Sequence, residues 1–346
     1  MRDLKYVAAY LVPATALLGL AWQDTWSWLT VALIFGILPV VEIFSPQSSS
    51  NVPEALEADR SKRLFFDLLL YLNAPLLFGI IGWYLWIIQA QTLSLAETIG
   101  LTLSVGIMAG ANGINVAHEL GHRATRTEQA LAQLMLLPSL YQHFFIEHNR
   151  GHHKNVATDE DPASARLGEN VFGFWWRSVT GGWRNAWALE QDRLEKTRQI
   201  KWSLDNGMLR YTSFQTLWLL GIWGLLGWQA LLGAIAIALV SILLLETVNY
   251  IEHYGLRRKM LPGGRPEPVS PQHSWNSDHE LGRIFLYELT RHSDHHYKST
   301  RKYQILRHLE ASPQMPFGYP TSIVMALVPP LWFRVMNKRV IRPEGE

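Results

Sequence analysis

Five long stretches without a charged residue restrict what this chain can fold into. They cover residues 6–23, 25–41, 68–88, 98–117 and 211–245. A helix needs about 20 apolar residues to cross the roughly 30 Å of hydrocarbon in a bilayer, so each of the first four stretches predicts one membrane span. The fifth stretch is 35 residues long and is broken by the sequence GWQ at 227–229, which predicts a tight hairpin of two spans.

The composition agrees with a membrane protein. Only 17% of the residues are charged, against about 25% in soluble domains. Because lipid offers no partner for backbone polar groups, helices and closed barrels are the structures that cross it. We therefore predict an all-α, polytopic membrane protein that forms a single domain over 1–346, with six transmembrane helices. The spans are expected at about 6–23, 25–43, 65–88, 98–117, 209–227 and 229–250.

The distribution of lysine and arginine predicts the orientation in the membrane. The connecting segment 45–63 carries three of these residues, whereas the segments 23–26 and 89–96 carry none. Basic residues mark the cytoplasmic side of a membrane protein. The arginine-rich segments 118–208 and 251–346 and both chain ends are therefore expected in the cytoplasm. The start MRDLKY is not followed by a small-residue cleavage site, so the first span is expected to be retained.

Two shorter apolar runs are expected at the membrane interface rather than across it. Ala130 to Phe145 is only 16 residues long and contains Pro138, and Pro316 to Phe333 contains four prolines. The net charge of +2 argues against nucleic acid as a partner, and the absence of cysteine excludes disulfides and thiolate-bound cofactors.

The histidines are the strongest sign of chemistry in this sequence. Of 13 histidines, nine fall in four groups. HELGH contains His118 and His122, HNRGHH contains His148, His152 and His153, NYIEHYG contains His253, and HSDHH contains His292, His295 and His296. Residues four apart share a helix face, so His148 and His152 are expected on one face, with His153 rotated by about 100°. Clusters with adjacent imidazoles predict two metal ions, while His143, His273, His279 and His308 are interpreted as ordinary residues.

The predicted topology brings these groups to one face of the membrane. His118 ends the fourth span, the next group follows with no span between, and the remaining groups come just after the sixth span. If Ala130 to Phe145 were a span, the groups would lie on opposite sides. The six-span prediction and the metal prediction therefore support each other.

The types of ligand residue limit which metal ions can bind, but they do not identify one. Imidazole suits zinc, copper, iron and nickel, and the lack of thiolates disfavours copper(I) and structural zinc. Zinc sites rarely need more than four ligands, and ligand type does not separate iron from copper. Metal-bound histidine usually donates its second N–H to a carboxylate or carbonyl. Candidates for that role are Glu119, Asn249, Glu252 and Asp294, with Glu147 and the trio Asp159, Glu160 and Asp161 also adjacent to the groups. Asn112, Asn115 and Glu246 are expected near the metals because polar groups at lipid depth are usually functional.

The motifs HELGHR, EHNRGHH followed by DEDPAS, NYIEHYG and RHSDHH together resemble those of membrane-integral alkane 1-monooxygenases. That family belongs to the histidine-box, non-haem di-iron hydroxylases and desaturases. The resemblance implies a catalytic domain with two iron ions held by the nine histidines. It also implies hydroxylation of the terminal methyl of medium- or long-chain n-alkanes with O2, in a bacterial-type inner membrane. The implied electron donor is rubredoxin, reduced by a flavoprotein reductase. Because this chain has no cysteine, the rubredoxin is expected on a separate chain or on a removed fusion.

The substrate and donor predict two further features. An alkane binds only through apolar burial, at about 0.8 kcal/mol per CH2, so a channel between the spans is expected. Ile107, Ala111 and Ile114 lie on one face of the fourth span that leads to His118, and we predict that this face lines the channel. Basic residues near the histidine groups are predicted to dock an acidic electron carrier. They are Arg150, Lys154, Arg257, Arg258, Lys259, Lys298, Arg301 and Lys302.

Three alternatives remain open. A fatty-acyl desaturase or hydroxylase shares the di-iron core but needs a polar pocket for the acyl headgroup. A metal-ion transporter places its ligands near the middle of the membrane, whereas these histidines follow the ends of spans. A structural membrane protein with histidines that bind ions adventitiously is the third. The sequence leaves chain-length preference, the division of ligands, any bridging group and the oligomeric state undetermined.

Overall fold

Five helical segments are long and apolar enough to cross a membrane in the computed structural model, which describes residues 2–340. They are Asp3–Trp22, Asp24–Ile43, Leu64–Ala90, Leu95–Gly121 and Gly207–His253. Their bounds agree with the predicted spans to within a few residues. Met1 and residues 341–346, on which the prediction for the two chain ends falls, lie outside the described residues.

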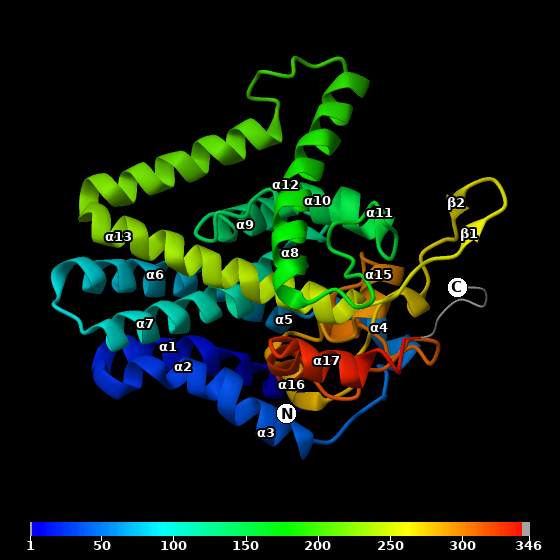
Figure 1. Ribbon diagram of the computed structural model, residues 1–346, viewed down its shortest axis with the longest axis horizontal. Coiled ribbons are helices and arrows are strands. Elements are labelled where there is room, and N and C mark those ends of the chain that lie inside the picture. The colour runs from blue at the N-terminus through cyan, green and yellow to red at the C-terminus, as the bar shows by residue number, and fades with distance from the viewer. Residues whose placement is uncertain (1, 341–346) are drawn as a thin grey trace.

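The fifth segment, α13 (Gly207–His253), folds back on itself. Its backbone leaves the helical conformation at Gly227, which has φ 85° and ψ −176°, a conformation that glycine adopts without steric cost. Figure 1 shows two helical arms that meet at this bend. The break predicted at 227–229 is confirmed. The first arm, 207–226, is about 30 Å long and the second, 228–253, is about 39 Å long.

The other four segments are each built from several helical pieces. They are η1 (Arg2–Tyr10) and α1 (Leu11–Trp22); η2 (Asp24–Trp28), α2 (Leu29–Val31), η3 (Ala32–Ile37) and α3 (Leu38–Ile43); α5 (Leu64–Tyr71) and α6 (Asn73–Ala90); α7 (Leu95–Met108), η4 (Ala109–Ile114) and α8 (Asn115–Gly121). Both η3 and η4 are π-helices. Figure 1 shows α6 and α7 beside α13, and α1 and α2 on the other side of α7.

Small and large residues interlock in the bundle, and its periphery is apolar. A side chain at Gly106 would begin 2.5 Å from Cβ of Val240, so glycine lets α7 approach α13 closely. On the outside, Leu217 and Leu225 are 64% and 86% exposed. Such exposure of large apolar side chains is favourable in lipid and costly in water. The chain is an integral membrane protein.

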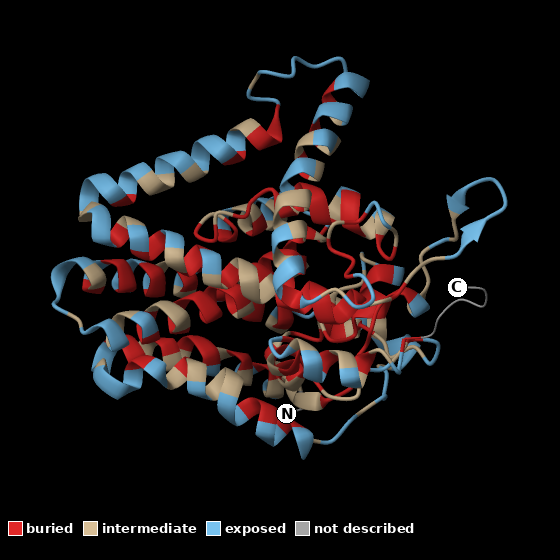
Figure 2. Cartoon of the chain, viewed as in Figure 1, coloured by how far each residue is buried: buried red, intermediate tan, exposed pale blue. Residues whose placement is uncertain are grey.

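The remaining elements form a cap toward one end of the bundle (Figure 1). They are α4 (Glu54–Ser61), α9 (Arg126–Met135), α10 (Phe144–Glu147), η5 (His148–His152), α11 (His153–Asn155), α12 (Val171–Lys196), β1 (Met260–Leu261), β2 (Arg265–Pro266), η6 (Pro271–His273), α14 (Glu280–Phe285), α15 (His292–Tyr297), η7 (Tyr303–Ile305), α16 (Tyr319–Ala326) and α17 (Pro329–Met336). Strands β1 and β2 pair antiparallel. Figure 2 shows that buried residues concentrate where this cap meets the bundle.

The two short apolar runs are divided among short elements. The first is split between α9, a turn and α10, and the second between α16 and α17. Neither is among the segments long enough to cross a membrane. This agrees with the interfacial interpretation.

Candidate metal centre

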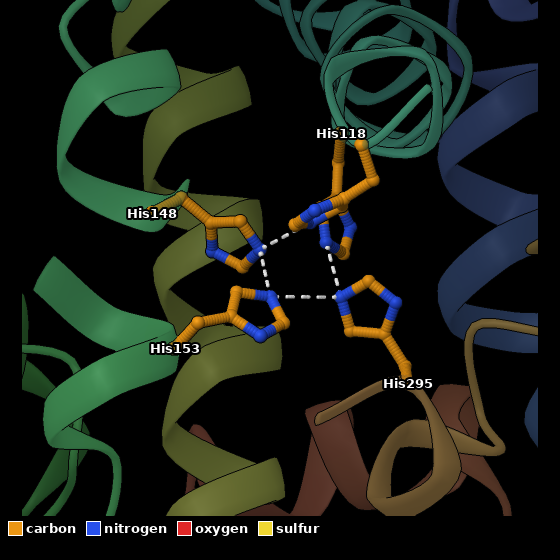
Figure 3. Close-up of side chains that lie close together, drawn as sticks. His118, His148, His153 and His295 are labelled. Carbon is orange, nitrogen blue, oxygen red and sulfur yellow. Dashed lines mark hydrogen bonds between the residues drawn. The ribbon is translucent and has the colours of Figure 1, made fainter. Parts of the chain in front are cut away.

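All nine grouped histidines come together in the structure, in two clusters. One contains His118, His122, His148, His153 and His295, and the other contains His152, His253, His292 and His296. Within each cluster the potential ligand nitrogens all lie within 4.8 Å of one another. Figure 3 shows four rings of the first cluster pointing toward a common centre. Neither cluster includes His143, His273, His279 or His308.

Four separate parts of the chain supply these rings. The pair from HELGH lies on α8 and just after it, at the end of the fourth apolar segment. His253 is the last residue of α13, HNRGHH spans η5 and α11, and HSDHH forms α15. The nine histidines thus meet where two membrane segments end and the cap begins.

Histidines that are adjacent in the sequence belong to different clusters. The prediction that His148 and His152 share a helix face is wrong. His152 and His153 fall in different clusters, and so do His295 and His296, as expected for two ions. However, His148 joins His153 rather than His152. The physical reason is the π-helix η5, which bonds residues five apart. This wider turn brings Nε2 of His148 to 3.0 Å from Nε2 of His153.

The distances between rings fit bound metal ions. Neighbouring Nε2 atoms lie 2.9–3.1 Å apart in the first cluster and 3.0–3.2 Å apart in the second. Two nitrogens at right angles around an ion, each about 2.1 Å from it, are about 3.0 Å apart, whereas a tetrahedral arrangement gives about 3.4 Å. The spacing therefore fits ions with more ligands than tetrahedral zinc has.

Three of the rings outside the membrane segments are in the protonation state that binds metals. Burial lowers the pKa of His153, His295 and His296 well below its usual value, and the neighbouring imidazoles lower it further. These rings are therefore neutral at pH 7. Neutral imidazole offers a lone pair to a metal.

One carboxylate fixes the orientation of a ring. Oδ2 of Asp161 lies 2.9 Å from Nδ1 of His152 and accepts a second hydrogen bond from Ser164. Burial by itself lowers the pKa of His152, but the carboxylates of Asp161, Glu147 and Glu252 together raise it to about 8. At pH 7 this ring is therefore mostly protonated, and a metal ion would displace the proton of Nε2 while Asp161 keeps the proton on Nδ1. Asp161 belongs to the acidic trio of the sequence, which alone did not distinguish it from its two neighbours.

Replacing Asp161 with asparagine is expected to weaken metal binding and activity by about 10- to 100-fold, as for other residues that orient metal-bound histidines. The amide no longer secures the proton on Nδ1 of His152. Metal content after dialysis against a chelator measures this. Asp159→Asn is the matched control. The side chain of Asp159 is 83% exposed, and its ion-pair partner is Arg257, 3.5 Å away. Equal metal loss in both variants would contradict the role of Asp161.

Glu252 also reaches the second cluster. Its Oε2 lies 3.1 Å from Nε2 of His292, the nitrogen that faces the other rings. Tyr319 donates a hydrogen bond to its other oxygen at 2.8 Å. This carboxylate therefore sits at the inner face of the second cluster, where it could itself hold a metal ion.

The other polar residues predicted near the rings make different contacts. Glu119 pairs with Arg123 and accepts from the backbone N–H of Tyr303. Asp294 pairs with Arg301 and accepts from the backbone N–H of Arg307. These two carboxylates tie the ligand segments to the cap.

Three polar residues predicted at lipid depth form hydrogen bonds with identified partners. Asn112 donates to Asn73 between two membrane segments, 2.9 Å away. Asn249 and Glu246 bond to each other at 3.3 Å and line a small polar cavity beside His148 and His152. Asn112 therefore joins spans, whereas the other two lie near the metal centre.

An apolar cavity of about 70 Å³ leads to the first cluster. Its wall ends at His118 and also contains Asn115 and Ala111. Apolar residues of several segments line the rest: Val12, Ile34, Leu38, Leu244, Leu245, Val248, Phe285, Leu286, Leu289 and Ile323. No charged side chain is among its lining residues.

The cavity wall differs from the face predicted for the fourth span. Ile107 and Ile114 are not among its lining residues, and Ile114 is fully buried in the hydrophobic core instead. The π-helix η4 lies between α7 and α8 and changes the angular register. The face predicted for the channel therefore shares only Ala111 with this cavity.

Comparison with known proteins agrees with this site. The sequence profile of the family described as fatty acid desaturase matches residues 93–324. Alkane 1-monooxygenase 2 of Pseudomonas aeruginosa is 38% identical over 93% of this chain and 86% of its own length. Alkane 1-monooxygenase of Pseudomonas putida is 37% identical over 95% of this chain and 83% of its own length. This chain belongs to the alkane 1-monooxygenase family.

A more distant relative extends the comparison. The xylene/toluene monooxygenase hydroxylase component of Pseudomonas putida is 29% identical over 99% of this chain and 90% of its own length. The match to the family model, at residues 93–324, includes all four histidine motifs of this alkane 1-monooxygenase family member.

Two tyrosines and a serine near the metal centre of this family member were missed by sequence reasoning. Tyr319 contacts Glu252, as described above, and Tyr141 and Ser178 each donate to Glu246. All three are buried. No spacing in the sequence connects them to the histidines, because they approach from other elements of the fold.

Proposed function

We propose that this protein is a di-iron monooxygenase that hydroxylates the terminal methyl of medium- or long-chain n-alkanes to 1-alkanols. The observation that carries the proposal is the apolar cavity that ends at His118, one of nine converging imidazoles. The nine histidines are proposed as ligands of two iron ions, five around one and four around the other. When bound, the two irons would supply the activation of O2.

The chain's own residues would do the rest. The apolar wall buries the alkane, which is favourable by about 0.8 kcal/mol per CH2, and orients its end toward His118. The same wall excludes water from the reacting methyl group. Asp161 holds the proton on Nδ1 of His152, and Glu252 places a carboxylate beside Nε2 of His292.

Oxygen uptake by the purified protein, with added rubredoxin and reductase, tests the proposal. Alkanes from octane to hexadecane are expected to stimulate uptake and to give 1-alkanols, with iron bound to the protein. Fatty acyl thioesters and toluene serve as alternative substrates. Acyl products in place of alkanols would instead support the desaturase alternative.

The site argues against the alternatives. A fatty-acyl enzyme needs a polar or basic pocket for the acyl headgroup. The cavity has no charged residue in its wall, and its polar side chains are limited to Asn115, Tyr319 and the clustered His118. A transporter needs ligands along a path through the membrane, whereas these histidines gather where the segments end. Metal flux in vesicles without alkane oxidation would support a transporter.

We further propose six spans in a bacterial inner membrane, with both arms of α13 crossing and the metal centre in the cytoplasm. The bend at Gly227 and the arm lengths support the count. The arginine-rich cap supports the orientation. Labelling of single introduced cysteines from each side of the membrane tests both points.

Rubredoxin, on a separate chain or on a removed fusion, is the proposed electron donor, and exposed lysines of the cap are its proposed docking site. Several predicted docking residues are occupied: Arg150 pairs with Glu190, Arg301 with Asp294 and Lys302 with Asp67. Arg257 lies near Asp159, and Arg258 donates to backbone carbonyls. By contrast, Lys154, Lys259 and Lys298 are exposed and form no ion pair among residues 2–340.

Reversing the charge at Lys154 and Lys298 is expected to raise KM for rubredoxin by about two- to fivefold per residue. The kcat is expected to stay unchanged, and added salt should reduce the difference by screening. Steady-state kinetics at low and high ionic strength measure this. Lys196→Glu is the control, because Lys196 is an exposed residue of α12 that pairs with Asp192. No dependence of KM on salt would contradict electrostatic docking.

A further inference from the structure

A second hollow, separate from the two histidine clusters, lies where α12 ends and α13 begins. It has a volume of about 520 Å³ and lies between α9, α12, η5 and the first turn of α13. Four arginines from these four elements line it: Arg126, Arg150, Arg193 and Arg210. None of the nine clustered histidines is in its wall.

The hollow carries an excess of positive charge. The four guanidinium groups face two carboxylates, Glu190 and Asp205. Glu190 is 2% exposed and binds both Arg150, at 3.0 Å, and Arg193, at 2.8 Å. It thereby holds these two arginines in the wall.

The other two arginines, Arg126 and Arg210, are exposed and form no ion pair among the described residues. Arg210 only donates a hydrogen bond to the carbonyl of Leu204. Most of the donors of these two guanidinium groups are therefore open to an anion. Arginine binds phosphate well because its planar fork can donate two parallel hydrogen bonds.

Apolar surface leads directly away from the hollow along α13. Arg210, Phe214 and Leu217 share one helix face because they are four and three residues apart. Phe214 is 50% exposed and Leu217 is 64% exposed. The arm that bears them belongs to the candidate membrane segment Gly207–His253, and its proposed crossing would place this face in lipid.

The loop before α13 is also built for a membrane surface. Ile200, Trp202 and Leu204 are 72%, 76% and 77% exposed. In Figure 1 the end of α12 and this loop project from the rest of the protein, and Figure 2 shows them exposed. Tryptophan is enriched at the level of lipid headgroups. These exposed residues would place the hollow at headgroup depth.

We propose that this hollow binds the phosphate group of an anionic phospholipid, whose acyl chains follow the first arm of α13. The excess of arginine selects a net negative headgroup, as basic pockets between membrane helices do. A soluble phosphate ester would use the arginines but not the adjoining apolar face. This inference does not depend on the reaction catalysed at the histidine clusters.

The test compares the double variant Arg126→Gln, Arg210→Gln with the unmodified protein. The full chain is reconstituted in vesicles of phosphatidylcholine alone or mixed with phosphatidylglycerol, and retained lipid is counted by native mass spectrometry. The double variant is expected to bind phosphatidylglycerol about tenfold more weakly, equivalent to about 1.4 kcal/mol. Its iron content and its melting temperature in phosphatidylcholine alone should match those of the unmodified protein.

Arg184→Gln is the matched control, because Arg184 is an exposed arginine of α12 outside the hollow. It is expected to retain phosphatidylglycerol normally, and equal loss in this variant would show a general surface effect and overturn the proposal. Unchanged retention in the double variant would also overturn it, and so would displacement of the lipid by inorganic phosphate. If the double variant does not fold, the single variant Arg126→Gln, at an exposed position of α9, is tested by the same criteria.

Discussion

Replacing His296 with alanine is expected to empty the four-histidine cluster and to abolish alkane hydroxylation. A four-ligand metal site is stabilised by about 10–16 kcal/mol, or about 2.5–4 kcal/mol for each ligand. Loss of one of four imidazoles should therefore weaken metal binding by about 70- to 900-fold. The remaining rings of this cluster, those of His152, His253 and His292, leave no spare ligand among the histidines. Metal analysis should then give about one iron per chain fewer than in the unmodified protein.

The control for this variant is His273→Gln. His273 is also buried, at 3% exposed, but it bonds to Glu267 and lies in neither cluster. Its replacement is expected to leave the metal content unchanged. If His296→Ala retained full metal content and activity, the four-histidine cluster would not be a metal site.

Replacing Ala111 with phenylalanine is expected to block the apolar cavity without removing metal. Ala111 lies on the cavity wall close to His118 in the same segment, and the cavity is only about 70 Å³. A phenyl ring there would exclude about three methylene groups of the substrate, which corresponds to about 2.4 kcal/mol or roughly 60-fold in kcat/KM for long alkanes. Shorter alkanes should be less affected. Product analysis over a series of chain lengths measures the shift.

The matched control is Ala236→Phe. Ala236 is a half-buried residue of α13 that lines a groove at the bend of the helical hairpin, with Trp228 and Gln229, far along the chain from the metal ligands. It should preserve both the iron content and the chain-length preference. An unchanged preference in Ala111→Phe, with iron retained, would mean that the alkane enters by another route.

Much of the fold could be predicted from the sequence because it depends on the summed hydropathy of neighbouring residues. Hydropathy over about 20 residues determines whether a helix is stable in lipid, so the bounds of the apolar segments and the break at Gly227 were correct to within a few residues. Residues 45–63 were predicted only as a connecting segment between spans, yet they contain the helix α4. Arg307 pairs with both Glu54 and Glu57 of this helix. A contact so distant in the sequence gives no local signal.

The sequence by itself determined which histidines come together. Their motifs follow the ends of apolar segments, and the order of those segments leaves them on the same side of the bundle. Tertiary structure alone decided how the rings divide. The π-helix η5 places His148 with His153, and the π-helix η4 turns Ile107 and Ile114 away from the cavity that Ala111 lines.

The contacts of the carboxylates were also decided only in three dimensions. Asp161 reaches His152 and Glu252 reaches His292, while Glu119 and Asp294 bond to the cap. The physical reason is the same in each case. Apolar length is a property of one segment, whereas the turn of a helix and the partner of a buried carboxylate depend on the segments packed around it.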